Sequence, residues 1–221
     1  MEALQETLRY RFRDDRLLTN ALTHSSYANE HHCASNERLE FVGDSVLGMV
    51  VAAQLYRDFP ALPEGRMTRL RAELVCERSL HEVAVRLGLG RRLRLGRGEE
   101  STGGRERPSI LADCVEAVIA ALYLDGGLAV AKRFIDDNIL CKLPEAEMLT
   151  HDYKTELQEL VQQTPGHSVC YEMTGESGPD HDKRFTAAVS LLGEEIGRGE
   201  GRTKKEAEQR AAQAALRRLN P

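Results

Sequence analysis

The sequence predicts an all-α domain over residues 1–143, followed by a small α+β domain of order α-β-β-β-α over residues 152–221. Two observations support this division. Apolar residues recur at helical spacing through most of the first part, whereas in the second part they alternate as in half-buried strands. Between the two patterns, residues 144–151 form a short polar stretch, which we interpret as a linker.

Helical spacing in the first part predicts long helices over residues 37–57, 66–87, 109–124 and 128–140. The third of these has favourable ends, because Pro108 is a good helix start and Gly126-Gly127 is a good stop. Residues 96–104 are rich in glycine but lack the Gly-Lys-Ser/Thr ending of a nucleotide-binding loop, so we expect a connector there.

In the second part, residues 152–162 are helical in pattern and begin at Asp152, a residue type that caps helix N-termini well. Three strands are predicted next. Their defining positions are Val169, Tyr171 and Met173, then residues 185–191, then Ile196 and Arg198. A last helix follows from an apolar stripe at Ala207, Ala211, Ala214, Ala215 and Leu219.

The first long helix carries acidic residues on one face. Glu37, Glu40 and Asp44 are three and four residues apart, so a helix places them side by side. The segment around them is largely apolar, and carboxylates near a buried surface are costly unless something compensates their charge. A bound cation would do so.

The third long helix repeats this feature, since Asp113 and Glu116 share a face of an otherwise apolar segment. If the two helices pack together, Glu40 and Asp44 join this pair around one point. Such a set of oxygen ligands suits Mg²⁺ or Mn²⁺. The sequence therefore predicts a metal centre between the two helices.

Two other interpretations compete with a magnesium centre. Nearby arginines (Arg38, Arg105 and Arg107) could pair with the acids and give them a structural role. A di-iron centre would want a Glu three positions before a His on a helix, and none of the seven histidines has one. The pairing of two acidic helices favours the centre that takes Mg²⁺.

Composition bounds the class of protein. The hydrophobic fraction of 41% is enough for a packed core, and the absence of an apolar run of about 18 residues predicts no membrane span. The N-terminus lacks the regions of a signal peptide, and five scattered cysteines without Cys-x-x-Cys pairs indicate a reducing, cytoplasmic environment. The net charge of −5 means that nucleic-acid binding would depend on local basic patches.

The segment from Asn36 to Leu47 resembles the signature motif of the bacterial ribonuclease III family, which are double-strand-specific endoribonucleases. The resemblance covers essentially the whole chain, and the part after residue 152 is similar to a double-stranded RNA-binding domain. Further matching segments are Ala21 to Ser25, Glu64-Gly65, Leu93 to Gly96, Gly98-Glu99 and Ile110 to Ala117. Val42 departs from the more usual Leu, which is an apolar exchange without chemical consequence.

The resemblance implies roles for the acidic residues. Glu40, Asp113 and Glu116 match the metal ligands, and Asp44 and Glu116 match the positions essential for catalysis. Glu37 and Glu64 match accessory acids. The family hydrolyses phosphodiesters in duplex RNA with Mg²⁺, or Mn²⁺ as a substitute, and leaves 5′-phosphate and 3′-hydroxyl ends. Ribosomal RNA precursors are the implied substrates, with messenger and transfer RNA precursors besides.

A-form RNA is bound through its 2′-hydroxyls and phosphates, which call for neutral hydrogen-bonding side chains and for lysine or arginine. Thr155, Gln158 and Gln162 share one face of the predicted helix and can hydrogen-bond to the 2′-hydroxyls. Lys204 and Lys205 begin the last helix and can bind the phosphates. Among these, Gln158, Lys204 and Lys205, together with His181 in the loop before the second strand, match RNA-contacting positions of the family.

A duplex has two strands, so a symmetric dimer with two sites would cut both. The family is homodimeric, and Phe41 is the candidate for a residue that inserts into the partner; alternatively, Phe41 belongs to the core. Three other functions compete with the nuclease: a duplex-RNA binder without cleavage, a structural helical domain, and a phosphohydrolase of small nucleotides. The presence of all four carboxylates and of the second domain disfavours each of them.

Overall fold

The structure, a computed structural model, describes residues 2–143, 152–179 and 183–219. The chain divides into two compact units between residues 146 and 147. We call them the helical unit and the α+β unit. The predicted linker, residues 144–151, lies outside the described residues, so its bounds stay a prediction.

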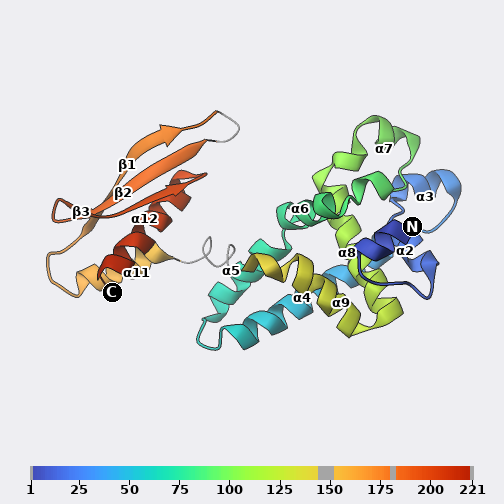
Figure 1. The fold of residues 1–221 in the computed structure, drawn as a ribbon, viewed down its shortest axis with the longest axis horizontal. Coiled ribbons are helices and arrows are strands. Elements are labelled where there is room, and N and C mark those ends of the chain that lie inside the picture. Colours follow the sequence, from blue (N-terminus) through green and yellow to red (C-terminus); the bar gives the residue numbers. More distant parts are fainter. Residues whose placement is uncertain (1, 144–151, 180–182, 220–221) are drawn as a thin grey trace. The chain divides into compact units, whose positions relative to one another are not determined.

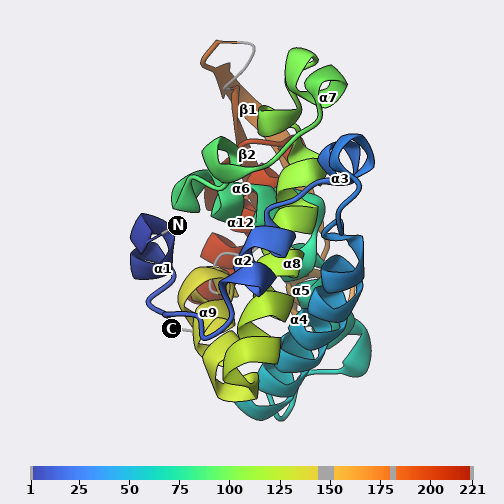
Figure 2. The same ribbon diagram turned by 90° about the vertical axis from the view of Figure 1, so that its right-hand side faces the viewer.

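The helical unit is arranged around α8, whose residues from Ile110 to Leu122 are mostly buried. Helices α2, α4, α6 and α9 pack against it (Figures 1 and 2). The helices are α1 (Glu2–Thr7), α2 (Asp15–Ala21), α3 (Ser25–His31), α4 (Glu37–Asp58), α5 (Glu64–Val75), α6 (Glu77–Leu87), α7 (Arg97–Ser101), α8 (Pro108–Gly126) and α9 (Leu128–Asn138), with single 3-10 turns η1 (Gly90–Arg92), η2 (Gly104–Glu106) and η3 (Leu140–Lys142). The predicted pairing of the first and third long helices is confirmed, since these are α4 and α8.

Two sequence predictions about this unit were wrong. The helix expected over residues 66–87 is two helices, because Cys76 has an extended backbone (ψ of 158°) that ends α5 and starts α6. The expected connector over residues 96–104 contains the short helix α7 and leads into η2. Ion pairs from Arg105 to Glu100 and from Arg107 to Glu99 hold this turn together, and glycine content alone did not reveal them.

Helix α4 is long and apolar enough to cross a membrane by length and composition, a property the sequence prediction had excluded. Its apolar residues have another role. Leu39, Leu47 and Val51 are buried in the core of the helical unit, where α4 packs against α8. α4 is therefore a core helix.

The α+β unit has the predicted order, with α11 (Tyr153–Gln162), β1 (Val169–Ser177), β2 (Arg184–Leu191), β3 (Glu194–Gly201) and α12 (Lys204–Leu219). The strands form an antiparallel sheet in the order β1-β2-β3. The predicted N-cap is confirmed, because the Asp152 carboxylate accepts a hydrogen bond from the backbone N–H of Thr155. Both helices pack on one face of the sheet (Figure 1).

Glycine and alanine set the distance between β3 and α12. A Cβ atom at Gly197 or Gly199 would overlap the backbone of α12 at Ala211. Helix and strand are therefore in backbone contact, and the alanine stripe of α12 is the face that allows it.

Candidate metal centre

The centre forms where α4 crosses α8. Gly43 of α4 lies directly against the backbone of Glu116, and a Cβ atom at position 43 would overlap its carbonyl oxygen. The absence of a side chain lets the two helices approach this closely. Glu40, one turn before Gly43, is thereby brought to the face of α8 that carries Asp113 and Glu116.

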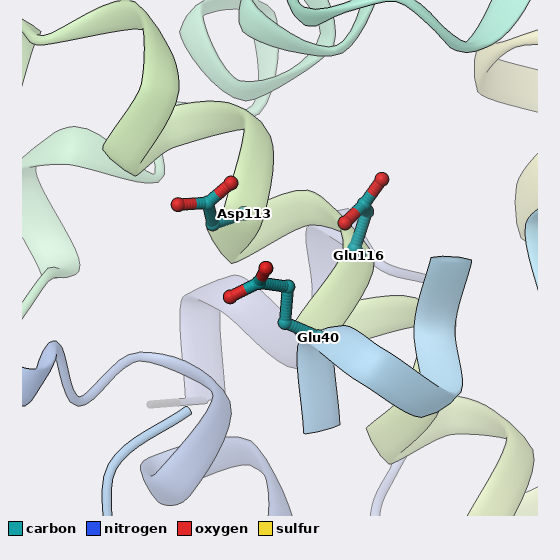
Figure 3. Close-up of side chains that lie close together, drawn as sticks. All are labelled: Glu40, Asp113 and Glu116. Atoms are coloured by element: carbon teal, nitrogen blue, oxygen red, sulfur yellow. The ribbon is translucent and has the colours of Figure 1, made fainter. Parts of the chain in front are cut away.

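Three carboxylates converge at this crossing. Glu40, Asp113 and Glu116 each offer one oxygen, and these oxygens all lie within 4.8 Å of one another. All three residues are partly buried. Figure 3 shows Glu40 from α4 and the other two from α8 around a shared space.

Burial and mutual repulsion shift the acids toward their neutral forms. Burial, followed by the charges of Asp44, Glu40 and Asp113, raises the pKa of Glu116 to about 8. The pKa of Glu40 is raised by burial and then by Asp113, Glu37 and Asp44. Excess negative charge at one point is what a divalent cation would relieve.

The pKa of Asp113 is also raised, first by burial and further by Glu77, while His24 acts in the opposite direction. These two neighbours were missed as part of the site. His24 lies in a segment that matched the family, and its Nδ1 accepts the Ser26 N–H at the start of α3. Glu77, whose charge acts on Asp113, is the first residue of α6, a helix start that helical spacing did not predict.

The structural interpretation of the acids, in which arginines neutralise them, is not supported. Arg105 pairs with Glu100 and Arg107 with Glu99. Arg38 is exposed on α4. Within the described parts of the chain, no ion pair involves Glu40, Asp113 or Glu116, so these residues fit a metal ion as their counter-charge.

The remaining predicted acids lie at different distances from this centre. Asp44 is exposed, and its charge acts on both Glu40 and Glu116, which places it at the rim. Glu37 acts on Glu40 and accepts a hydrogen bond from Ser35 Oγ at 2.6 Å. Glu64 begins α5 and accepts a hydrogen bond from Thr68 Oγ at 2.8 Å; its charge is not among those that shift the pKa values of the three converging carboxylates.

The predicted RNA-contacting residues lie on the helices of the α+β unit. Thr155 and Gln162 are exposed on α11, Gln158 is partly exposed there, and Lys204 and Lys205 are exposed in the first turn of α12. The Thr155 hydroxyl donates to Asp152 at 2.8 Å. His181 lies outside the described residues, and its predicted role stays a prediction.

Family models match both units. The model described as Ribonuclease-III-like matches residues 14–143, and the model described as Double-stranded RNA binding motif matches residues 153–219. With the carboxylate centre in the first unit, these matches define a nuclease that carries its own duplex-RNA-binding module.

Known relatives extend over nearly the whole chain. It is 52% identical over 214 residues to Ribonuclease 3 of Symbiobacterium thermophilum, covering 96% of this chain and 91% of the relative. Ribonuclease 3 of Desulforamulus reducens is 49% identical, with 98% and 90% covered. The nuclease domain of ribonuclease III from Campylobacter jejuni has a TM-score of 0.61 at 42% identity, covering 65% of this chain and 96% of that domain. The chain belongs to the ribonuclease III family and is an endoribonuclease.

Proposed function

We propose that this enzyme uses Mg²⁺, with Mn²⁺ as a substitute, to hydrolyse phosphodiester bonds in double-stranded RNA and leave 5′-phosphate and 3′-hydroxyl ends. The observation that carries the proposal is the convergence of three partly buried carboxylate oxygens within 4.8 Å, without a cationic side chain paired to them among the described residues. Oxygen-only donor sets are those that Mg²⁺ prefers.

Glu40, Asp113 and Glu116 would hold the metal, which when bound supplies an activated water and neutralises charge on the scissile phosphate. Glu116 is largely protonated at neutral pH while the centre holds no cation, since its pKa is about 8. It therefore gives up a proton when a cation binds. Asp44, exposed at the rim, would accept a hydrogen bond from a water that approaches the phosphate.

The α+β unit would bring duplex RNA to this centre. Thr155, Gln158 and Gln162 offer hydrogen-bonding groups for 2′-hydroxyls on one face of α11, and Lys204 and Lys205 offer cations for phosphate. We assign His181 to a second minor groove on the resemblance alone. Ribosomal RNA precursors and other structured transcripts in the cytoplasm are the proposed substrates.

A homodimer would give one centre to each strand. Phe41, Met49 and Tyr56 on α4 are 77%, 51% and 73% exposed, so α4 presents large apolar side chains to solvent on the side away from the core. Phe41 is not among the core residues of the helical unit, which supports its assignment to an interface. A ribonuclease III nuclease domain from Campylobacter jejuni has a region described as involved in dimer formation. We propose that this face of α4 pairs with its copy across a two-fold axis.

A cleavage assay tests the proposed activity. Purified protein is mixed with a labelled RNA hairpin or its single-stranded control, in Mg²⁺ or in EDTA. We expect the hairpin alone to be cut, only with Mg²⁺, and each product to carry a 5′-phosphate. Binding of the hairpin without cutting in both Mg²⁺ and Mn²⁺ would leave a duplex-RNA binder and refute the proposal.

A further inference from the structure

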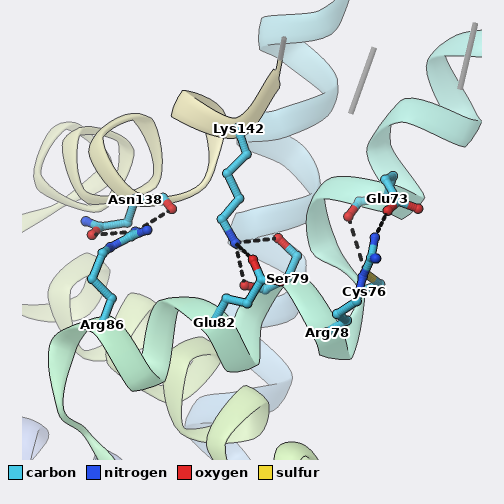
Figure 4. A network of polar contacts seen from close by, with 8 residues as sticks. All are labelled: Glu73, Cys76, Arg78, Ser79, Glu82, Arg86, Asn138 and Lys142. Atoms are coloured by element: carbon cyan, nitrogen blue, oxygen red, sulfur yellow. Dashed lines mark hydrogen bonds and ion pairs between the residues drawn. The ribbon is translucent and has the colours of Figure 1, made fainter. Parts of the chain in front are cut away.

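The last described turn of the helical unit is bonded to α6 by one lysine. Lys142 of η3 donates from Nζ to the Ser79 carbonyl at 3.0 Å, to Ser79 Oγ at 3.4 Å and to Glu82 Oε2 at 2.7 Å. Figure 4 shows the lysine crossing from η3 to α6. Its side chain is only 17% exposed, so these three acceptors replace most of its water.

A second contact holds the chain just before this turn. Arg86 Nη2 of α6 donates to the carbonyl of Asn138 at 2.9 Å and to its Oδ1 at 3.2 Å (Figure 4). Ile139 is fully buried. Residues up to 139 are therefore fixed without Lys142, whereas residues 140–143 depend on Lys142 and on the partly buried Leu140 and Leu143.

Helix α6, to which Lys142 is bonded, is itself part of the core of the helical unit. Leu80 and Val83 of α6 are buried in the core where α6 packs on α8, the helix that carries two of the metal ligands. Anchoring η3 to α6 thus fixes the last described turn of the unit that holds the carboxylate centre.

We propose that Lys142 is a positioning residue that sets the length of the tether between the nuclease centre and the RNA-binding unit; this rests on the proposed function. The next capped residue is Asp152, nine Cα steps from Leu143 and thirteen from Ile139. At 3.6 Å per step, release of the anchor extends the maximal span from ~32 Å to ~47 Å. The effective concentration of the centre at a duplex held by the other unit then falls, by roughly twofold.

The experiment uses the full chain and a long labelled hairpin. Lys142→Glu sets a like charge against Glu82 and releases the anchor; Lys142→Met replaces it if the first variant does not fold. Lys132→Glu is the matched control, since Lys132 pairs with Asp136 on α9 at 2.6 Å and leaves the tether unchanged. A third variant inserts four residues after Leu143 with Lys142 intact.

We expect the Lys142 variant and the insertion to cut at a broader set of positions, with kcat/KM about twofold lower, while Lys132→Glu keeps the wild-type pattern. Amide hydrogen exchange at Lys142, whose N–H donates to Ile139 at 3.0 Å, should accelerate in the Lys142 variant alone. A folded Lys142 variant that cuts at the wild-type positions would overturn the inference. So would altered cleavage positions in the Lys142 variant that the four-residue insertion does not reproduce. A wild-type protein that cuts no duplex would instead overturn the proposed function, and the inference with it.

Discussion

At the scale of single residues, Glu116 has the largest pKa shift of the three carboxylates, since burial and three neighbouring acids raise its pKa to about 8. We expect Glu116→Gln to abolish cleavage while duplex RNA binding remains, because the substitution keeps the side-chain shape and removes a metal oxygen. Cleavage and gel-shift assays on the same hairpin check this. Loss of RNA binding as well would assign Glu116 a structural role.

The same pKa predicts how metal-free stability depends on pH. Glu116 ionises near 4.5 in the unfolded chain and near 8 in the fold, so the folded state holds its proton longer. The contribution of Glu116 to stability should therefore be greatest below its unfolded pKa and fall as pH rises from about 5 to about 8. Thermal unfolding in EDTA measures this slope. Glu116→Gln should flatten it, and an equal slope in that variant would place its origin elsewhere.

Gly43 predicts a second residue-level effect. Its missing side chain allows α4 to touch the backbone of Glu116. Gly43→Ala should cost about 1–3 kcal/mol of unfolding free energy and weaken Mg²⁺ binding by moving Glu40 away from α8. Gly65→Ala is the control: Gly65 is also helical with nothing within 4 Å of its Cβ position, and alanine there should stabilise by about 0.5–1 kcal/mol. Denaturant unfolding and calorimetric Mg²⁺ titration measure both effects, and equal behaviour of the two variants would contradict the argument.

The sequence predicted the ligands at this scale but not how they meet. Residue spacing alone placed Asp113 and Glu116 on one face and indicated a metal centre, and the resemblance then implied the role of each acid. The contact of Gly43 with Glu116 depends on helix packing across 73 positions of chain, and no local pattern contains it. His24 and Glu77 were missed for the same reason, since the charge of each acts on Asp113 from another part of the fold.

At the scale of elements, the long periodic helices and the α-β-β-β-α order could be predicted, while the breaks could not. Apolar spacing continues through Cys76, and only the extended backbone there separates α5 from α6. The short helix α7 is held by ion pairs to Arg105 and Arg107 from outside its own sequence. The local sequence pattern predicts a helix or strand well when the burial of its own apolar face stabilises it. The pattern fails where side chains outside the element determine whether it forms.

The start of α12 carries a prediction about RNA. Its first turn is capped by Thr203, whose Oγ accepts the Glu206 N–H at 3.1 Å. Lys204 and Lys205 follow at the positive end of the helix dipole, where cations are unfavourable unless an anion binds. Replacing both lysines by alanine should weaken duplex binding equally for all sequences and reduce the slope of log K against log salt by about 2.

Filter binding of two unrelated RNA duplexes across a series of salt concentrations provides the measurement. Arg198→Ala is the control, because Arg198 is exposed on β3 and pairs with Glu195 at 2.7 Å. The neighbouring Gly197 and Gly199 face α12, so strand alternation directs Arg198 to the opposite face of the sheet. An unchanged slope in the lysine variant would move the phosphate contacts to other residues of the unit.

At the scale of the whole molecule, a chain of net charge −5 acts on a polyanion. Part of that negative charge is local, because five acids interact within one region of the helical unit. They are Glu37, Glu40, Asp44, Asp113 and Glu116. A metal ion would neutralise charge there, and the exposed lysines of α12 are on the other unit. The acidic balance therefore includes the acids of the proposed metal centre and does not oppose RNA binding, which depends on local charge.

Assembly gives the last prediction. A single centre cuts one strand, so double-strand cleavage in one encounter requires two copies, and the exposed apolar side chains of α4 supply the surface. Phe41→Asp should separate the protomers: removing a buried aromatic anchor costs about 2 kcal/mol in each symmetric half, which makes the dimer roughly 10³-fold weaker. Leu192→Asp is the matched control, since Leu192 is 73% exposed in the turn between β2 and β3 and lies on the other unit.

Sedimentation velocity should find the wild type and Leu192→Asp as dimers and Phe41→Asp as a monomer at micromolar concentration. The monomer keeps the three carboxylates of the proposed centre, because Phe41 is exposed and is not one of them, so Mg²⁺ binding per chain should be unchanged. Its cleavage of a duplex should shift from paired cuts to single-strand nicks, seen as loss of short duplex products on native gels. Paired cuts by a monomeric variant would show that one chain serves both strands, and the two-fold arrangement would then have no catalytic purpose.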